Sequence, residues 1–380
     1  MNLSTAEILA LISALAFVPI AAITLYNIVA APRLRKPPDG QPSEFPEVSI
    51  LIPARNEEGN IGACIESLMK QTYPNLSITV LNDQSTDNTA EIVRSYADQD
   101  KRLQLYDGKP LPDGWYGKAW ACAQLGEEAQ GDILLFTDAD TYHDPDAVSH
   151  TVAWLNGTDA GMISAFSQQV TVSFMERLVV PLVDMLLYCL LPLPLVYKLR
   201  SPSVAGANGQ WIAFTRNAYN SIGGHESVRN NIVEDIELSR VAKRRGVKVL
   251  TTAGTGAVYC RMYKNAAEVV EGFTKNLFAI AGSNVIIFAA GSAALFAAFI
   301  LPYALVAVPG VMEYALMLVA ANIALRVAVA VVYKHPVVLG AVLHPVGIMV
   351  LIGMGIRSIV KTYQGSVIWK ERTIPTSRHA

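Results

Sequence analysis

The sequence predicts an α/β domain with a Rossmann-like, mostly parallel sheet, together with one N-terminal and about three C-terminal transmembrane helices. Between residues 48 and 263, short β-branched apolar runs alternate with helical patterns, as in parallel sheets covered by helices. Long uncharged stretches precede and follow that region. Of the 380 residues, 52% are hydrophobic and 16% are charged, which is too apolar for an ordinary soluble enzyme and too charged for a membrane bundle alone.

Residues 1–34 are predicted to be a transmembrane anchor. The run 8–31 carries no charge and is long enough to cross a hydrocarbon core of roughly 30 Å as a helix. A cleaved signal peptide is the alternative, but the run is too long and no basic residue precedes it. Arg33, Arg35 and Lys36 follow, so the positive-inside rule places the next domain in the cytoplasm.

The C-terminal transmembrane helices are expected in residues 277–358, after an interfacial helix at 264–276 and before a basic tail at 359–380. Breaks at 309–310 and 334–336 divide the apolar block into three pieces of near membrane-spanning length. Three crossings would place the tail outside, whereas its basic residues favour the inside. Either the last piece is re-entrant or the long first piece contains an extra turn.

Two more segments border the α/β domain. Residues 35–47 are rich in proline and are expected to form a stiff linker. The apolar stretch 178–197 holds Asp184 in its middle and two prolines near its end, which favours a helix lying in the membrane interface. A core helix of the α/β domain is the alternative.

Polar side chains follow three of the five predicted strands. Arg55 and Glu57 follow the first strand, Asp83 the second, and Asp138 and Asp140 the fourth. In open parallel sheets, ligands bind outside the carboxyl ends of the strands. Carboxylates gathered there repel one another unless a cation or ligand donors join them. The pattern therefore predicts a nucleotide diphosphate held through a hard divalent cation.

Acidic residues also open the helix predicted at 235–245. Asp235 can take the proton from an attacking hydroxyl as a general base. The alternative is an acidic first turn that only stabilises the helix.

In this combination and order, the motifs resemble the family 2 glycosyltransferases, whose domain has the GT-A fold. The matching segments are PARNEE, NDQSTDNT, TDAD, GANGQWIAFTR and VED. The resemblance implies an inverting enzyme, dependent on Mn²⁺ or Mg²⁺, that transfers a hexose from a UDP-sugar, with UDP-glucose favoured. It also implies a single in-line displacement without a covalent enzyme intermediate.

Within that family the chain resembles the membrane-bound branch that includes hopene-associated, carotenoid-acid and ceramide glycosyltransferases. The resemblance is carried by LPDGWYGKAWACAQ, IGGHESVRNNIVEDIELSR, WKER and the layout of the apolar helices. It implies a membrane lipid acceptor and a bacterial inner membrane protein with a cytoplasmic catalytic domain. No Arg-Trp pair follows Arg261, which puts ceramide in doubt and disfavours a processive polymer product.

The resemblance also assigns roles to single residues: Asp235 is the general base, and Asp140 and Asp138 are metal ligands. The residues expected to bind the donor are Pro53, Ala54, Arg55, Glu57, Asp83, Lys118, Asp138 and Arg261. The residues expected to bind the acceptor are Gly206, Asn208, Gly209, Gln210, Trp211 and Glu234.

Two other functions stay open. A polyprenyl phosphate acceptor needs basic residues near the membrane, and Lys198 and Arg200 can supply them. A non-catalytic membrane scaffold needs none of the site carboxylates, although all of them are present.

Composition excludes some partners. A net charge of −2 gives no basic field for nucleic acid. The four cysteines are far apart and show no metal-ligand spacing. The sequence does not determine the oligomeric state.

Overall fold

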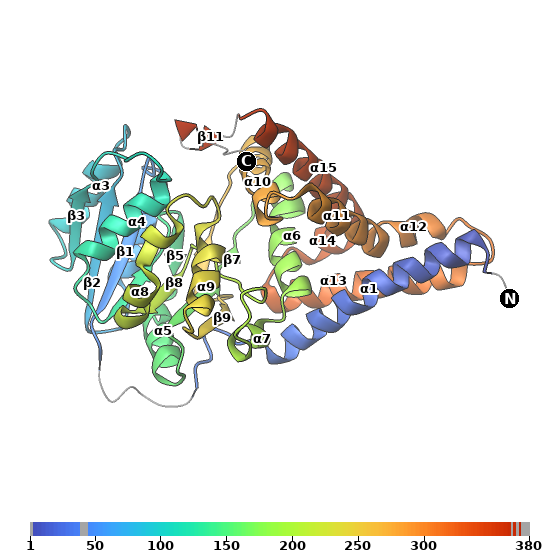
Figure 1. Ribbon diagram of the computed structural model, residues 1–380, viewed down its shortest axis with the longest axis horizontal. Coiled ribbons are helices and arrows are strands. Elements are labelled where there is room, and N and C mark those ends of the chain that lie inside the picture. Colours follow the sequence, from blue (N-terminus) through green and yellow to red (C-terminus); the bar gives the residue numbers. More distant parts are fainter. Residues whose placement is uncertain (1–2, 39–44, 366–367, 370–371, 374–380) are drawn as a thin grey trace. The chain divides into compact units, whose positions relative to one another are not determined.

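The computed structural model describes residues 3–38, 45–365, 368–369 and 372–373. The chain forms two compact units. The helical unit comprises Met1–Ala30, Thr171–Pro192 and Tyr263–Ala380, and the α/β unit comprises Ala31–Val170 and Leu193–Met262. Figure 1 shows their helices and strands.

A seven-stranded sheet organises the α/β unit, with the strand order β3-β2-β1-β4-β8-β6-β9. The strands are β1 (Val48–Ala54), β2 (Leu76–Asn82), β3 (Leu103–Asp107), β4 (Ile133–Phe136), β6 (Met162–Phe166), β8 (Ile212–Thr215) and β9 (Val249–Ala253). Only β8 runs antiparallel to its neighbours β4 and β6. The mostly parallel sheet predicted from the sequence is therefore confirmed.

Both faces of this sheet are covered, because its central strands are apolar on both sides. In β1, Ile50, Leu51 and Ile52 are all fully buried, as expected for a parallel strand between helical layers. The connecting helices are α2 (Ile61–Met69), α3 (Thr89–Ala97), α4 (Gly117–Glu128) and α5 (Ala147–Asn156).

The register of the strands brings the polar strand ends together. Ala54 at the end of β1 lies opposite Asn82 at the end of β2, and the Asp83 N–H donates to the Ala54 carbonyl over 2.8 Å. On the other side of β1, the Thr137 N–H donates to the Leu51 carbonyl over 3.1 Å. The turns after β1, β2 and β4 thus share one edge of the sheet.

A small second sheet, in the order β5-β10-β7, lies beside the turn after β4. Its strands are β5 (Thr141–His143), β7 (Gln168–Gln169) and β10 (Val258–Cys260). Cys260 pairs with Thr141 on one side and Gln169 on the other. The other helices of the α/β unit are α7 (Leu193–Lys198), α8 (Arg216–Ile222), the 3₁₀ helix η1 (Gly224–Val228) and α9 (Glu234–Arg244).

The helical unit contains three helices that are long and apolar enough to cross a membrane: α1 (Thr5–Ala30), α13 (Met312–Tyr333) and α15 (His344–Tyr363). The pair α10 (Ala266–Ile280) and α11 (Val285–Phe299) bends by 112° and forms either a broken span or a re-entrant loop. The described residues therefore hold three candidate spans, or four if the bent pair is one. The other helices are α6 (Phe174–Leu190), α12 (Leu301–Leu305) and α14 (Val337–Val342).

The observed helices can be compared with the apolar segments predicted from the sequence. The bend after α10 falls in the long first apolar piece, and the last piece is divided at Leu343 between α14 and α15. The stretch 178–197 is divided between α6 and α7, at a break that includes Pro192. Its location in the membrane interface stays a prediction. Residues 39–44 of the linker and most of the tail beyond Gly365 lie outside the described residues.

Buried polar contacts join the helices of this unit. The Asn27 side chain of α1 donates to the carbonyls of Tyr188 and Leu191, each over 2.8 Å. Arg326 of α13 is 2% exposed, and its guanidinium lies 3.1 Å from Nδ1 of His335. A different packing of the helices would leave these polar groups without hydrogen-bond partners in an apolar medium. Such contacts therefore favour one packing arrangement.

Packing around Gly131, just before β4, leaves no room for a side chain. A Cβ there would lie 2.7 Å from the Glu47 carbonyl oxygen and from the Ser49 nitrogen. We expect Gly131→Ala to destabilise the protein by about 1–3 kcal/mol, because backbone atoms cannot yield as a flexible side chain can. The measurement is the apparent unfolding temperature. Gly62→Ala in α2 is the control, since its Cβ would meet nothing closer than 3.5 Å. Equal unfolding temperatures for the two variants would contradict the packing described here.

Candidate active site

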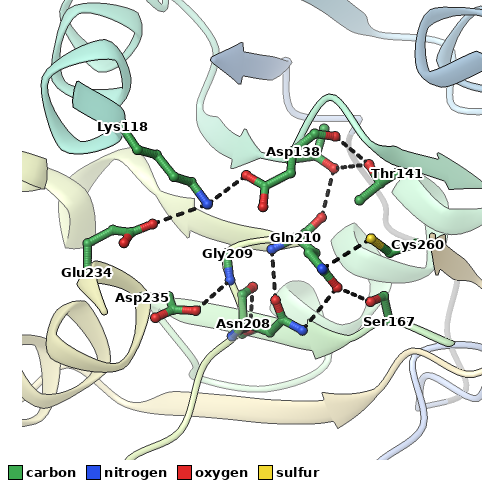
Figure 2. A network of polar contacts seen from close by, with 12 residues as sticks. Lys118, Asp138, Thr141, Ser167, Asn208, Gly209, Gln210, Glu234, Asp235 and Cys260 are labelled. Carbon is green, nitrogen blue, oxygen red and sulfur yellow. Dashed lines mark hydrogen bonds and ion pairs between the residues drawn. The ribbon is translucent and has the colours of Figure 1, made fainter. Parts of the chain in front are cut away.

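A single lysine links two carboxylates that come from distant parts of the α/β unit. Lys118, in the first turn of α4, places its Nζ 2.7 Å from Oδ1 of Asp138 and 3.1 Å from Oε1 of Glu234 (Figure 2). Asp138 follows β4, and Glu234 opens α9. The bridge therefore draws α4, the end of the sheet and the start of α9 to one point.

Burial and neighbouring charge change the acidity of this cluster. Burial raises the pKa of Asp138, while the Lys118 ammonium opposes that rise. Burial would lower the pKa of Lys118, but the two carboxylates outweigh it and hold that pKa well above its ordinary value. For Asp235, burial and the charge of Glu234 raise the pKa to about 6. Lys118 thus stays charged, and Asp235 titrates close to neutral pH.

Two backbone N–H groups orient the Asp235 carboxylate. Gly209 donates to Oδ2 over 2.9 Å, and Ile236 donates to Oδ1 over 2.8 Å. A Cβ on Gly209 would lie 2.7 Å from Nζ of Lys118. A side chain at this position would therefore push the Lys118 ammonium out of its place between the two carboxylates.

Figure 2 shows the hydrogen bonds that hold the side chains of the loop 206–211. The Gln210 amide donates to Sγ of Cys260 over 3.2 Å, and its carbonyl oxygen accepts hydrogen bonds from Ser167 and Asn208. The Gln210 N–H in turn donates to Oδ1 of Asn208 over 3.0 Å. These contacts set the position of Gly209 and, through it, that of Asp235.

A small cavity lies at the centre of this arrangement. The predicted site residues that line it are Pro53, Lys118, Asp138, Gly209, Glu234 and Asp235. Its volume is about 10 Å³, close to the minimum that holds one water molecule. A larger ligand can enter only if lining side chains, which include Lys118, move.

Other carboxylates lie close to this cavity. Burial raises the pKa of the Cys260 thiol, and a hydrogen bond with Asp140 raises it further. Burial likewise raises the pKa of the Cys64 thiol, and Asp140, Asp138 and Glu57 add to that rise through their charges. Glu57, Asp138 and Asp140 therefore act on the same region, as their positions after β1 and β4 predict.

The donor set suits a divalent cation that is shared with a phosphate ligand. Among the described residues, no three His, Cys, Asp or Glu side chains are arranged to hold a metal alone. Mg²⁺ is commonly bound by one or two carboxylates together with substrate phosphates, and both Asp138 and Asp140 supply such oxygens. The two residues thus supply oxygen ligands of the kind that such a cation needs.

The turns after β1 and β2 interlock, and several of the predicted donor residues hold them together. The Arg55 guanidinium donates to the backbone carbonyls of Asp83 and Gln84, over 2.7 and 3.1 Å. The Glu57 N–H donates to Oγ1 of Thr89 over 2.7 Å, which ties the first turn to α3. Asp83 is 3% exposed. In this structure Arg55 and Asp83 thus fix the turns that border the cavity.

The prediction that Trp211 contacts the acceptor is wrong for its side chain. Trp211 is fully buried in the hydrophobic core, where its indole N–H donates to Oγ1 of Thr151 over 2.9 Å. Its ring centroid lies 4.7 Å from that of His143. The remaining predicted residues that do not line the cavity are Ala54, Arg55, Glu57, Asp83, Asp140, Arg261, Gly206, Asn208 and Gln210.

Several residues that line the cavity were not predicted from the sequence. Two of them could have been found from their helical spacing to predicted site residues. Cys122 lies four residues after Lys118 on α4, and Leu238 lies four residues after Glu234 on α9, so each pair shares a helix face. His225 also lines the cavity. Its Nδ1 lies 2.8 Å from the Tyr219 hydroxyl, and burial lowers its pKa to about 3, so its ring is neutral.

Comparison with known proteins identifies the class of this domain. Residues 49–221 match the family described as "Glycosyl transferase family 2". A mannosyltransferase from Pyrobaculum calidifontis, solved in complex with GDP-Man and Mn²⁺, superposes with a TM-score of 0.59 at 19% identity. The superposition covers 94% of this chain and 98% of that one. The α/β unit therefore has the GT-A fold, and its residues 49–221 are similar to family 2 glycosyltransferases, as the motifs predicted.

A curated relative agrees with this assignment. The 4,4'-diaponeurosporenoate glycosyltransferase of Staphylococcus aureus (strain USA300) is 31% identical over 247 residues. The match covers 62% of this chain and 62% of the relative, so the chain spans less than two thirds of the curated relatives that it matches. The resemblance to carotenoid glycosyltransferases stated from the sequence is confirmed at this level.

Trp211→Phe separates a core role from a ligand-binding role. We expect the variant to lose about 1–3 kcal/mol of stability, because it forfeits the hydrogen bond to Thr151 and part of the core packing. Its KM for any substrate should match that of the wild type. Thermal unfolding and initial-rate kinetics measure the two effects. Trp120→Phe is the control. The Trp120 indole N–H also donates a hydrogen bond, to the Lys109 carbonyl over 3.1 Å, but the Trp120 side chain is only partly buried. A raised KM with unchanged stability would restore Trp211 to the binding site.

Proposed function

We propose that this chain transfers a hexose from UDP-glucose to a hydroxyl group of a membrane lipid of the hopanoid, carotenoid or sphingolipid kind. The observation that carries the proposal is the convergence of Lys118, Asp138, Glu234 and Asp235 on one cavity. The family 2 domain supports sugar transfer, and the apolar helices support a membrane location. UDP as the donor nucleotide is inferred from the sequence resemblance. Because the similar mannosyltransferase structure holds GDP-Man, the experiment below compares a uridine donor with a guanosine donor.

Asp235 is the proposed general base. In the transfer, the acceptor oxygen bonds to the anomeric carbon, the bond from that carbon to the diphosphate breaks, and Asp235 takes the hydroxyl proton. A pKa of about 6 suits this step, because the carboxylate is ionised at neutral pH and still basic enough to accept a proton. The N–H groups of Gly209 and Ile236 hold the carboxylate in place.

Asp138 and Asp140 are the residues proposed to hold the divalent cation. When bound, that cation would neutralise the charge that develops on the departing diphosphate. Lys118 now pairs with Asp138 and Glu234, and it would turn to the diphosphate when the donor enters. One side chain would then both hold the two carboxylates before the donor arrives and bind the donor afterwards.

The catalytic domain is proposed to face the cytoplasm. Three basic residues, Arg33, Arg35 and Lys36, follow α1 directly, as the positive-inside rule requires of a cytoplasmic flank. The lipid acceptor is supported by the similarity to the 4,4'-diaponeurosporenoate glycosyltransferase, whose name gives a carotenoid acid as its acceptor, and by the candidate membrane spans. The experiment is to incubate the purified protein with lipid extracts, or with polyprenyl phosphate, and with radiolabelled UDP-glucose or GDP-mannose. The labelled lipid product identifies both the donor and the acceptor.

Asp235→Asn removes the proposed base. We expect transfer to fall by about 10²–10⁴-fold while donor affinity stays near that of the wild type, because the amide keeps the shape but cannot take the proton. Single-turnover transfer and calorimetric UDP binding measure the two effects. Glu237→Gln, in the same helical turn but paired with Arg240 and Arg244, is the matched control and should transfer normally. Transfer at the wild-type rate by Asp235→Asn would refute the assignment.

The pH dependence of the rate follows from the raised pKa of Asp235. Since the base must be ionised, kcat/KM should rise about tenfold per pH unit below pH 6 and level off above it. Initial rates between pH 4.5 and about pH 8 give this profile. The Glu237→Gln variant should show the same midpoint. A flat profile across pH 6 would be inconsistent with Asp235 as the base.

Asp140→Asn tests the cation site. The wild type should bind UDP more tightly when Mn²⁺ is present, and Asp140→Asn should abolish that gain, because an amide oxygen is a weaker ligand than a carboxylate. Calorimetry with Mn²⁺ and with chelator measures the difference. Asp146→Asn is the control, since Asp146 instead accepts a hydrogen bond from Thr72 over 2.7 Å. If chelation leaves UDP affinity of the wild type unchanged, the cation role of Asp140 is wrong.

A further inference from the structure

A second cavity in the α/β unit is lined by basic side chains. It has a volume of about 100 Å³ and lies between the end of α7, the end of α9 and the start of β9. The lining residues are Tyr197, Lys198, Leu199, Arg200, Lys243, Val247, Lys248 and Val249. Four of the eight are cationic and none is acidic, so the cavity attracts anions.

Lys243 is the most buried and most firmly held of the cationic side chains that line this cavity. It is 5% exposed, and its ammonium donates to the carbonyls of Val196 and Leu199 over 2.6 and 2.7 Å. An ammonium has three N–H donors, so one is left to face the cavity. Burial lowers the pKa of Lys243 to about 8, which means that its charge lacks full compensation where it lies. An anion in the cavity would supply that compensation.

Only one of the other three cations has an acidic neighbour among the described residues. Lys248 pairs with Asp159, whose side chain is 63% exposed, and it also lies over the Tyr197 ring, 5.5 Å from its centroid. Lys198 and Arg200 are exposed, and among the described residues neither takes part in an ion pair. Positive charge therefore exceeds negative charge around the cavity.

This cavity is distinct from the candidate active site. Lys243 lies eight residues beyond Asp235 on the same helix, α9, which corresponds to about 12 Å along the helix axis. A ligand held by Lys243 is thus not the donor diphosphate held beside Asp138. Because both sites share α9, the ligand would also hold the end of the helix that carries the proposed base.

We propose that this cavity binds a phosphate group, carried either by an anionic lipid headgroup or by a soluble phosphate. Lys198, Arg200, Lys243 and Lys248 contact the phosphate oxygens, which lysine binds as a point charge and arginine through a planar fork. Leu199, Val247 and Val249 give an apolar wall for the group that the phosphate carries. The order of the chain supports a lipid source, because Lys198 and Arg200 directly follow the apolar stretch 178–197.

The test uses the full chain in nanodiscs and the double variant Lys198→Ala/Arg200→Ala. Lys243 is left intact, because its hydrogen bonds hold the end of α7. The control is Arg94→Ala/Lys101→Ala, which removes the same charge from exposed positions elsewhere in the unit. One arm titrates inorganic phosphate by calorimetry in phosphatidylcholine discs. The other measures retention of phosphatidylglycerol by native mass spectrometry in mixed discs.

We expect the double variant to lose about tenfold or more in affinity in at least one arm, as the removal of charge-assisted hydrogen bonds predicts, while the control binds like the wild type. Loss in the phosphate arm identifies a soluble phosphate ligand, and loss in the lipid arm alone identifies a headgroup. Equal binding by the double variant and the control in both arms would overturn the proposal. Asp235→Asn should bind phosphate normally, so failure of the proposed transfer reaction leaves this test intact.

Discussion

The ammonium of Lys118 between Asp138 and Glu234 is the interaction on which the rest of the site depends. Without it, Asp138, Glu234 and the adjacent Asp235 would bring like charges together in a half-buried cluster, and only protonation or another cation would relieve the repulsion. Removing one partner of such a pair leaves the other charge unpaired, at a cost that grows with burial. The bridge therefore opposes the rise in the pKa of Asp138 and holds the Asp138 and Glu234 side chains in place.

The fold explains why such a cluster forms where it does. Parallel pairing of β1 with β2 and β4 brings three polar turns to one edge of the sheet, and α9 adds its acidic first turn. The antiparallel strand β8 then directs the loop 206–211 back across this edge, so that the Gly209 N–H reaches Asp235. Acidic residues that would repel in water are thus gathered by backbone geometry and balanced by one cation. In the proposed function, a nucleotide with its own divalent ion would take the place of that cation.

The parallel sheet, Asp138 and Asp235 could be predicted from simple rules of pattern and position, whereas Lys118 and Glu234 were predicted only through the resemblance to family 2 glycosyltransferases. Alternating strand and helix patterns fix the sheet, and the strand ends fix where Asp138 and Pro53 lie. Sequence reasoning was wrong about Trp211 because adjacent residues at a strand entrance point to opposite sides, and one position decides between core and cavity. Arg55 and Asp83 were expected to bind the donor, which stays a prediction, and no local pattern indicated that they also secure the two turns to each other. No local pattern could predict the basic cavity, since Lys198 and Lys243 meet only after α7 and α9 pack.

A structure of the protein with UDP-glucose and Mn²⁺ tests the central claim most directly. We expect the anomalous signal of manganese beside Asp138 and Asp140, the diphosphate next to it, and the Lys118 ammonium turned away from Asp138 toward the phosphates. Nucleotide bound elsewhere on the α/β unit, with the Lys118 bridge to Asp138 and Glu234 unchanged, would contradict the assignment of this cavity as the site of sugar transfer.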